Sequence, residues 1–285
     1  MKLDSHLHVW ADKGQAASFP FPGGEPPYPG NAELLLDSMK ESDVHGALIV
    51  QPANHKFDHS YVSSVLARYP GKFVGCLLAD PTENGGGVDE LDRLITQEGY
   101  RAVRFNPYLW PEDQSMANEV GRAMFKRAGE LGAPVGFMTF KGLLNHVKDI
   151  EELCEAYPRT TVMLDHFGFC KCSAPDSEEW AALLSLARFP QVYVKVSAFF
   201  RVSDEPYPYM DARPMIRRLI DGFGADRLLW GTDFPWITEQ CGYAKAWRIV
   251  DDGDREESGN GLLSSEEKEK IFGGNLARLF PGGWY

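Results

Sequence analysis

"TTVMLDHFGFCKCSAPDSEEWAALLSLARFPQVYVKVSAF" is the sequence of residues 160–199, and it decides the class of fold. Its two ends, residues 160–168 and 191–199, are short apolar runs that predict strands. Residues 177–190 between them predict a helix. Strands that alternate with helices pair in parallel, and the helices bury both faces of the sheet. The stretch therefore predicts an α/β fold.

The same alternation extends over the whole chain. Six more apolar runs predict strands, at residues 3–9, 46–51, 72–80, 100–106, 133–140 and 227–236. The segments between and after them predict helices, at residues 31–43, 60–70, 87–99, 117–132, 144–158, 212–224 and 264–280. Eight such units predict a (β/α)₈ barrel of the TIM type, with one domain over residues 1–285. An open doubly wound sheet is the alternative, but no GxGxxG motif follows the first strand.

The composition narrows the class of partner. The net charge is −12, with 41 acidic and 29 basic residues, which argues against nucleic acid or an anionic membrane surface. No apolar run approaches the ~20 residues that span a bilayer. We expect a cytoplasmic enzyme with a small-molecule substrate; a cleaved organelle transit peptide and the oligomeric state are left open. The acidic segment 251–261 is expected to be a solvated surface loop.

Polar residues recur where the predicted strands end. They are His6, His8, Gln51, Arg104, Asn106, His166, Lys195, Ser197 and Asp233, with His55 in the loop after Gln51. In a barrel the carboxyl ends of the strands meet at one rim, where active sites lie. His6 and His8 are two residues apart, so they point to the same face of the first strand. We expect His6, His8, His166 and Asp233 to meet in one pocket.

The remaining residues of this set are expected to contact substrate. Burying an unpaired guanidinium is costly, so Arg104 needs either a structural carboxylate or an anionic group of the substrate as its partner. We expect the substrate to be anionic and Arg104 to bind it, with Gln51, His55, Asn106, Lys195 and Ser197 also in contact. For His55 the alternative is a solvated loop residue, and for Lys195 it is an ion pair. Asp165 points away from His166 in the predicted strand, so we expect it to have a structural role or to position the site residues rather than contact substrate.

Four motifs resemble the amidohydrolase-related (amidohydrolase 2) family, and most closely its branch of 2-pyrone-4,6-dicarboxylate lactonases and sugar lactonases. The motifs are DSHLHVW (4–10), LDHFG (164–168), LLWGTDFPW (228–236) and IFGGNLARLF (271–280). The resemblance implies a hydrolase that opens a lactone or another cyclic ester of a small carboxylated or sugar-derived substrate. It implies that Asp233 takes a proton from the attacking water and that His6, His8 and His166 complete the catalytic set.

The resemblance leaves the need for a metal open. Metal-dependent members of the superfamily usually add a histidine on the fifth strand and a lysine on the fourth. Here the fifth strand reads APVGFMTF (133–140) and the fourth ends with Arg104, so we expect no binuclear site. His6, His8 and Asp233 could hold one divalent ion, Zn or Mn, and a metal-free site is the alternative. No organic cofactor is expected. The alternative functions are a metal-dependent decarboxylase of the same superfamily and a catalytically silent binding barrel.

Overall fold

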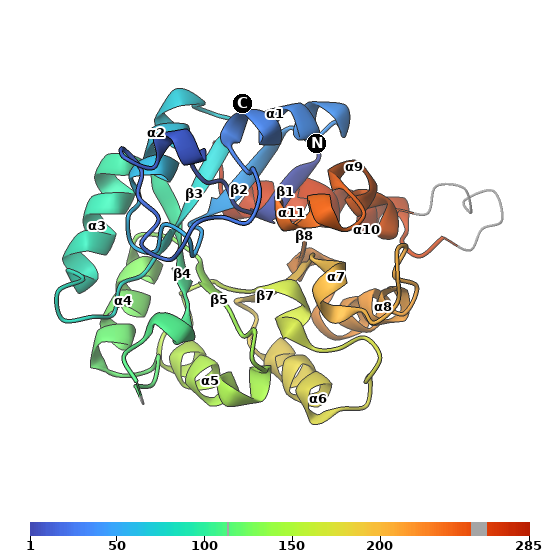
Figure 1. The fold of residues 1–285 in the computed structure, drawn as a ribbon. Coiled ribbons are helices and arrows are strands. Elements are labelled where there is room, and N and C mark those ends of the chain that lie inside the picture. The colour runs from blue at the N-terminus through green and yellow to red at the C-terminus, as the bar shows by residue number, and fades with distance from the viewer. Residues whose placement is uncertain (113, 252–260) are drawn as a thin grey trace.

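The computed structural model describes residues 1–112, 114–251 and 261–285, and it shows a ring of strands surrounded by helices (Figure 1). Eight parallel strands pair in the order in which they occur along the chain. They are β1 (Leu3–Leu7), β2 (Gly46–Val50), β3 (Phe73–Leu78), β4 (Tyr100–Phe105), β5 (Val135–Phe137), β6 (Val162–Leu164), β7 (Val192–Val196) and β8 (Leu228–Trp230). The predicted (β/α)₈ barrel is confirmed.

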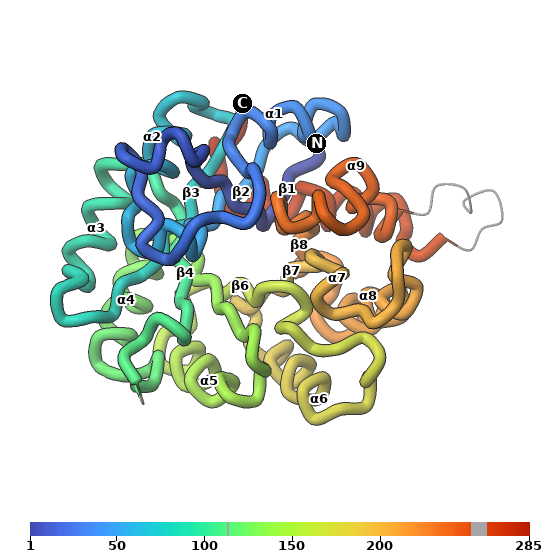
Figure 2. The backbone as a smooth tube through the Cα atoms, viewed as in Figure 1, coloured from blue at the N-terminus to red at the C-terminus, as the bar shows by residue number. Residues whose placement is uncertain are grey.

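Helices connect consecutive strands around the outside of the ring, as the tube in Figure 2 shows. They are α1 (Ala32–Glu41), α2 (Ser60–Arg68), α3 (Gly87–Glu98), α4 (Glu119–Glu130), α5 (Val147–Ala156), α6 (Glu178–Ser185), α7 (Phe199–Val202) and α8 (Ala212–Phe223), the last two both after β7. The chain continues beyond β8 through α9 (Tyr243–Ala246), α10 (Ser265–Glu269) and α11 (Asn275–Leu279). In the described ranges, no helix combines the length and the apolar character that crossing a membrane requires.

Some predicted boundaries were wrong. The expected strand 133–140 is only three residues long, because the chain leaves the sheet after Phe137 and turns toward the barrel mouth. The expected helix 264–280 is interrupted by a π-helical segment, Lys270–Gly274. There Gly273 packs so closely against Met1 that a side chain would not fit. Most of the predicted acidic loop, residues 252–260, lies outside the described residues.

Two apolar clusters form the core. One fills the inside of the barrel with side chains from the strands, such as Leu48 and Met163, and the C-terminal segment adds Leu276 and Phe280 to it. The other lies between the strands and the surrounding helices. Both clusters are buried, so the ring of strand ends is a rigid support for the polar side chains at the mouth.

The start of the chain and the segment after β8 close the barrel next to the polar rim. The amide of Asp233 donates to the carbonyl of His6 at 2.8 Å, and the amide of His8 donates to the carbonyl of Phe234 at 2.7 Å. A Cβ atom on Gly231 would lie 2.9 Å from the nitrogen of His6, so only glycine permits this approach. The closure places Asp233 directly beside the two histidines of β1.

Candidate active site

The carboxyl ends of the strands surround a cavity of about 210 Å³. Its polar lining side chains are His8, Asn54, Arg104, His166, Arg201 and Asp233. Four of these, His8, Arg104, His166 and Asp233, were expected at the rim from the sequence. They belong to β1, β4, β6 and β8 or to the residues just after them, so only the closed barrel brings them together.

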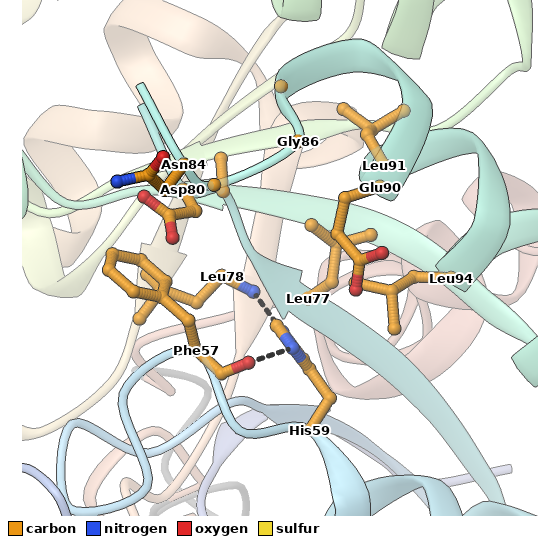
Figure 3. Close-up of a pocket in the computed structure, with 13 residues that line it drawn as sticks. Phe57, His59, Leu77, Leu78, Asp80, Asn84, Gly86, Glu90, Leu91 and Leu94 are labelled. Atoms are coloured by element: carbon orange, nitrogen blue, oxygen red, sulfur yellow. Dashed lines mark hydrogen bonds between the residues drawn. The ribbon is translucent and has the colours of Figure 1, made fainter. Parts of the chain in front are cut away.

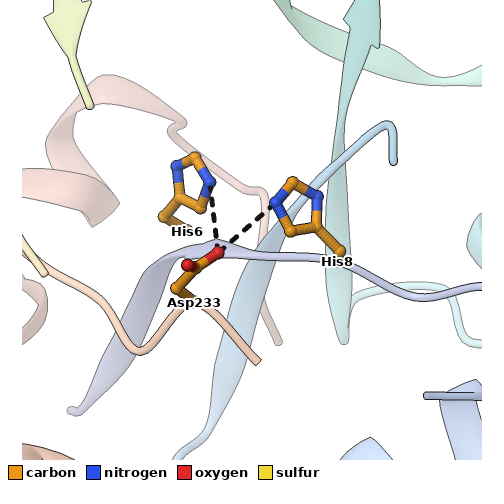
Figure 4. Close-up of side chains that lie close together, drawn as sticks. All are labelled: His6, His8 and Asp233. Carbon is orange, nitrogen blue, oxygen red and sulfur yellow. Dashed lines mark ion pairs between the residues drawn. The ribbon is translucent and has the colours of Figure 1, made fainter. Parts of the chain in front are cut away.

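His6, His8 and Asp233 converge where β1 meets the segment after β8 (Figure 4). Oδ1 of Asp233 lies 3.4 Å from Nε2 of His8 and 3.9 Å from Nε2 of His6. Nδ1 of His8 lies 2.8 Å from the carbonyl oxygen of Val50. A carbonyl only accepts, so Nδ1 of His8 carries a proton, and Nε2 is the ring atom that faces Asp233.

The ring of His6 is held from behind by two charged groups. Its Nδ1 lies 3.0 Å from Oδ1 of Asp165 and 3.0 Å from Nζ of Lys195. Donation from Nδ1 to Asp165 leaves a lone pair on Nε2, whereas acceptance from Lys195 places the proton on Nε2. Among the described residues, His6 Nε2 and Asp233 Oδ1 are both buried without a hydrogen-bond partner. The space between them calls for a cation or a water molecule.

Asp165 is a buried carboxylate that pairs with both Arg104 and Lys195. Its Oδ2 accepts from Nε and Nη2 of Arg104 at 3.1 and 2.9 Å, and its Oδ1 accepts from Lys195 at 2.9 Å. Burial acts to raise the pKa of Asp165, but Lys195, His6 and Arg104 outweigh it and hold this pKa well below the ordinary value. Asp165 is therefore ionised, and Lys195 forms an ion pair behind the cavity, the alternative that the sequence left open.

His166 lies next to the other carboxylate oxygen of Asp233, Oδ2. Its Nε2 lies 4.0 Å from Oδ2 of Asp233, and its Nδ1 lies 2.7 Å from Oγ of Ser197. Burial, with a further contribution from His6, lowers the pKa of His166 well below its ordinary value, so the ring is neutral at neutral pH. His166 and Asp233 both have positive φ angles, 47° and 64°. Such backbone strain is typical of residues that are held in place at functional sites.

Arg201 belongs to the site although the sequence did not single it out. Its Nε donates to Oδ2 of Asp233 at 2.6 Å, and its guanidinium lies 5.4 Å from the centre of the Trp236 ring. Burial acts to raise the pKa of Asp233, but His166, His8 and Arg201 outweigh it and lower that pKa to about 2. Arg201 lies in α7, beyond the end of β7. The alternation of side chains along a strand therefore could not predict where the Arg201 side chain points.

Asp4 fixes the position of the segment that carries Asp233. Its carboxylate accepts from the amide and the hydroxyl of Thr232 at 3.0 and 2.6 Å, from the amide of His6 at 3.0 Å and from the hydroxyl of Tyr243 at 3.1 Å. Burial raises the pKa of Asp4 to about 6, and these hydrogen bonds limit the rise. At neutral pH the ionised carboxylate ties β1 to the residue that precedes Asp233.

Five residues that were expected to contact substrate are not part of the cavity lining. Gln51 donates to the carbonyls of Lys56 and Asp58, and His55 is bonded to the carbonyl of Pro20 and the amide of Ala11. Asn106 caps the short 3₁₀ helix Pro107–Leu109 by accepting from the amide of Tyr108. Lys195 and Ser197 lie behind the lining, in contact with His6 and His166. All five have supporting partners within the protein.

A second cavity, of about 270 Å³, lies between β3 and α3 and shares no lining residue with the cavity at the barrel mouth (Figure 3). His59 is in its wall, but both ring nitrogens of His59 are occupied. Nδ1 donates to the carbonyl of Phe57 at 2.9 Å and Nε2 accepts from the amide of Leu78 at 3.1 Å. His59 therefore joins the loop to β3 and offers no free group for chemistry.

Comparisons with known proteins identify the family of the chain. The profile of the amidohydrolase family matches residues 3–282. The chain belongs to this family. The 4-sulfomuconolactone hydrolase of Hydrogenophaga intermedia is 27% identical over 286 residues, which cover 97% of this chain and 88% of that protein. The L-fucono-1,5-lactonase of Burkholderia ambifaria is 24% identical and is matched over 98% of this chain and 95% of its own length. The names of both relatives of this amidohydrolase describe the hydrolysis of a lactone.

Solved structures show the same fold. A candidate 2-pyrone-4,6-dicarboxylic acid hydrolase from Pseudomonas putida superposes with a TM-score of 0.78 at 22% identity, over 100% of this chain and 98% of that one. An amidohydrolase from Burkholderia multivorans, solved with bound zinc, gives a TM-score of 0.73 at 19% identity, with 98% of each chain covered. At these identities the likeness supports the barrel itself.

The trio of His6, His8 and Asp233 fits a divalent metal ion. The three ligand atoms lie within 4.8 Å of one another, and all three residues are buried. Nδ1 of His8 is bonded to a carbonyl, so its Nε2 is the atom that can bind a metal, and Oδ1 of Asp233 and Nε2 of His6 have no hydrogen-bond partner among the described residues. Two imidazoles and one carboxylate that leave a position for water are a common ligand set of catalytic zinc. The carboxylate of Asp165 behind His6 is the kind of partner that orients a metal-binding histidine.

Proposed function

We propose that this amidohydrolase opens a lactone or another cyclic ester of a small anionic substrate. The observation that carries the proposal is the position of Oδ1 of Asp233, which faces the imidazoles of His6 and His8 and has no hydrogen-bond partner among the described residues. Such an oxygen can receive the proton of an attacking water molecule. The relatives whose names describe lactone hydrolysis support a cyclic ester as the substrate. Arg104 and Arg201 in the cavity lining support an anionic one.

The reaction that we propose adds water across the acyl–oxygen bond of the ring. The water oxygen bonds to the carbonyl carbon while Oδ1 of Asp233 takes one of its protons. The bond from the carbonyl carbon to the ring oxygen then breaks, and Asp233 returns the proton to the ring oxygen as it leaves. The product is an open-chain hydroxy acid. Arg201 holds Oδ2 of Asp233 and so directs Oδ1 toward the water.

A pKa of about 2 makes Asp233 a weak base, so the carbonyl group must also be activated. We assign this task to Nε2 of His166. When Oγ of Ser197 donates to Nδ1 of His166, the proton of the ring lies on Nε2, which can donate to the developing oxyanion. A zinc ion or similar cation held by His6, His8 and Asp233 would lower the pKa of water and polarise the carbonyl.

Arg104 is the side chain that we propose for the anionic group of the substrate. Nε and Nη2 of Arg104 are bonded to Asp165, so this guanidinium is fixed in place. Its Nη1 has no partner among the described residues, and Arg104 lines the cavity. Arginine suits this role, because its charge is permanent and its planar fork matches a carboxylate or sulfonate.

Decarboxylation by the same residues is less well supported. A 2,6-dihydroxybenzoate decarboxylase from Rhizobium shares the fold, with a TM-score of 0.71 at 13% identity. In this chain β5 ends at the buried Phe137 and is followed by Met138 in the cavity wall, so it supplies no further metal ligand. A decarboxylase of this type depends on a firmly held metal ion, and three ligands hold it less firmly than four.

The test is a screen of carboxylated, sulfonated and sugar-derived lactones with a pH indicator, since each turnover releases an acid. Hydrolysis of a lactone supports the proposal. Release of carbon dioxide from aromatic carboxylates, measured in the same preparation, would replace the proposal with a lyase. Absence of both reactions would indicate a binding barrel. A chelator added to an active preparation separates a metal-dependent reaction from a metal-free one.

A further inference from the structure

The cavity has two aromatic walls on opposite sides of the barrel mouth. Trp10 follows β1 and Phe140 follows β5, and both line the cavity. In a closed ring of eight strands taken in order, β1 and β5 lie across from each other. Trp236, after β8, extends the first wall, and Phe169, after β6, extends the second. The four aromatic residues line the same cavity as His8, His166 and Asp233, and the space between the two walls is called the slot below.

The wall formed by Trp10 and Trp236 is fixed by its surroundings. The two rings are 5.9 Å apart between centres, and Tyr28 packs against both at 6.0 and 5.4 Å. The indole N–H of Trp10 donates to the carbonyl of Tyr28 at 2.9 Å, and Arg201 lies over the ring of Trp236. These contacts hold the wall in one position before a ligand enters.

The opposite wall is partly open to solvent. Phe140 packs edge-on against Phe169, with ring centres 5.6 Å apart, and Phe169 packs in the same way against His166 at 5.1 Å. Phe140 nevertheless has 55% of its surface exposed, more than any other phenylalanine among the described residues. A flat ligand between the walls would cover this surface.

The same lining offers few partners for hydroxyl groups. Asn54 is its only side chain with a neutral amide or hydroxyl among the described residues, and the amide nitrogen of Asn54 already donates to the carbonyl of Gly24. The other polar side-chain groups are the catalytic cluster, the two arginines and the indole N–H groups of Trp10 and Trp236, of which that of Trp10 donates to the carbonyl of Tyr28. A sugar lactone carries several hydroxyl groups, and each one buried without a partner lowers affinity by roughly tenfold or more.

We propose that the slot selects a planar, unsaturated lactone ring with an anionic substituent over a polyhydroxylated sugar lactone, and that Phe140 is a specificity-determining residue. The aromatic walls contact the two faces of the ring, and Arg104 receives the anionic substituent. This selection rests on the proposed lactone hydrolysis, and it names the substrate class of the same cavity.

The direct test compares kcat/KM for two lactones, coumalate and gluconolactone. Coumalate is a planar pyrone carboxylate, and gluconolactone is a saturated, hydroxylated ring without charge. The saturated carboxylated lactone of hydroxyglutarate separates the effect of planarity from that of charge. We expect coumalate to exceed the saturated carboxylated lactone by about tenfold and gluconolactone by a hundredfold or more. A preference for gluconolactone would overturn the inference.

A variant at Phe140 tests the wall itself. Phe140→Ala removes an exposed ring, so the fold should be retained, and KM for coumalate should rise roughly three- to tenfold with kcat little changed. Leu144→Ala is the matched control, because Leu144 is an exposed apolar residue of the same loop that does not line the cavity. Equal KM values for coumalate in the wild type and in Phe140→Ala would show that the ring does not select.

A binding assay keeps the two proposals distinguishable. Isophthalate is a planar dianion that has no ester to hydrolyse, and gluconate is a hydroxylated anion of similar size. Quenching of tryptophan fluorescence should show tighter binding of isophthalate than of gluconate, with the difference reduced in Phe140→Ala. If no lactone is hydrolysed but isophthalate binds more tightly than gluconate, the proposed hydrolysis is wrong, and the proposed selectivity of the slot for planar anions is supported. If gluconate binds as well as isophthalate, the slot fails.

Discussion

Nε of Arg201 donates a 2.6 Å hydrogen bond to Oδ2 of Asp233, and Oδ1 of the same carboxylate faces His6 and His8. The two oxygens of Asp233 therefore have different surroundings. A fixed cation holds Oδ2, and Oδ1 has no partner among the described residues. The arrangement keeps Asp233 ionised although it is buried, and it leaves one oxygen available to accept a proton.

Replacing Arg201 should change the pH dependence of the reaction. Arg201 favours the ionised form of Asp233, so Arg201→Gln should raise the pKa of Asp233 from about 2. Activity is present above this pKa, and the acidic limb of kcat/KM should therefore move to higher pH in the variant. Arg201→Lys, which keeps the charge, should move it less. Superimposable acidic limbs in the wild type and Arg201→Gln would contradict the pairing.

Arg104→Met should mainly raise KM for an anionic substrate, by roughly 10- to 100-fold, because a charge-assisted contact is lost. It also removes one of the two cationic side chains that pair with Asp165, so urea unfolding must be measured alongside. Arg101→Met is the control: Arg101 lies on the same strand, but its guanidinium contacts the carbonyl of Pro281. A KM unchanged in Arg104→Met would remove Arg104 from the substrate site.

Asp4→Asn should reduce both kcat and the free energy of unfolding. An asparagine side chain has one acceptor oxygen and an NH₂ group that must face the donors of Thr232 and Tyr243. Buried donors left without partners cost about 1–3 kcal/mol each. Tyr243→Phe removes only one of these donors and should have a smaller effect. If Asp4→Asn and Tyr243→Phe were equally active and stable, Asp4 would not be positioning Asp233.

Lys195→Met should strengthen the binding of zinc. Nζ of Lys195 lies 3.0 Å from Nδ1 of His6, where it adds positive charge and competes with Asp165 for that nitrogen. Without it, Nδ1 donates to Asp165 and Nε2 keeps its lone pair. Competition against a chromophoric chelator should show zinc affinity at least tenfold higher than in the wild type. Asp165→Asn should bind zinc more weakly, and the reverse order would contradict the ligand assignment.

The sequence could predict the fold and the floor of the site because both follow from short-range patterns. The parallel strands of a barrel end at one rim, so the positions of His6, His8, His166 and Asp233 relative to the strands were enough to bring them together. Arg201 could not be found in this way, because it lies in a helical turn that starts from Ala198, whose φ of 48° no strand pattern indicates. The direction of its side chain depends on Asp233, which is distant in sequence.

The roles of the supporting residues also depend on tertiary contacts. Alternation along β7 placed Lys195 and Ser197 on one face, but it did not show that other side chains cover them. His55 was read as a solvated loop residue or a substrate contact, yet it is fully buried between Phe21 and Tyr61. Each of these positions is decided by which neighbours arrive from other parts of the chain.

The central claim is that Asp233 receives the proton of the attacking water, and the most direct test is the kcat of Asp233→Asn on a confirmed lactone. The amide keeps the shape but cannot accept the proton. We predict a loss of roughly 10²- to 10⁴-fold in kcat, with the unfolding transition preserved and bound metal measured in the same samples. Asp221→Asn, at an exposed position, is the control and should be unaffected. A kcat for Asp233→Asn close to that of the wild type would contradict the claim and make His166 the next candidate base.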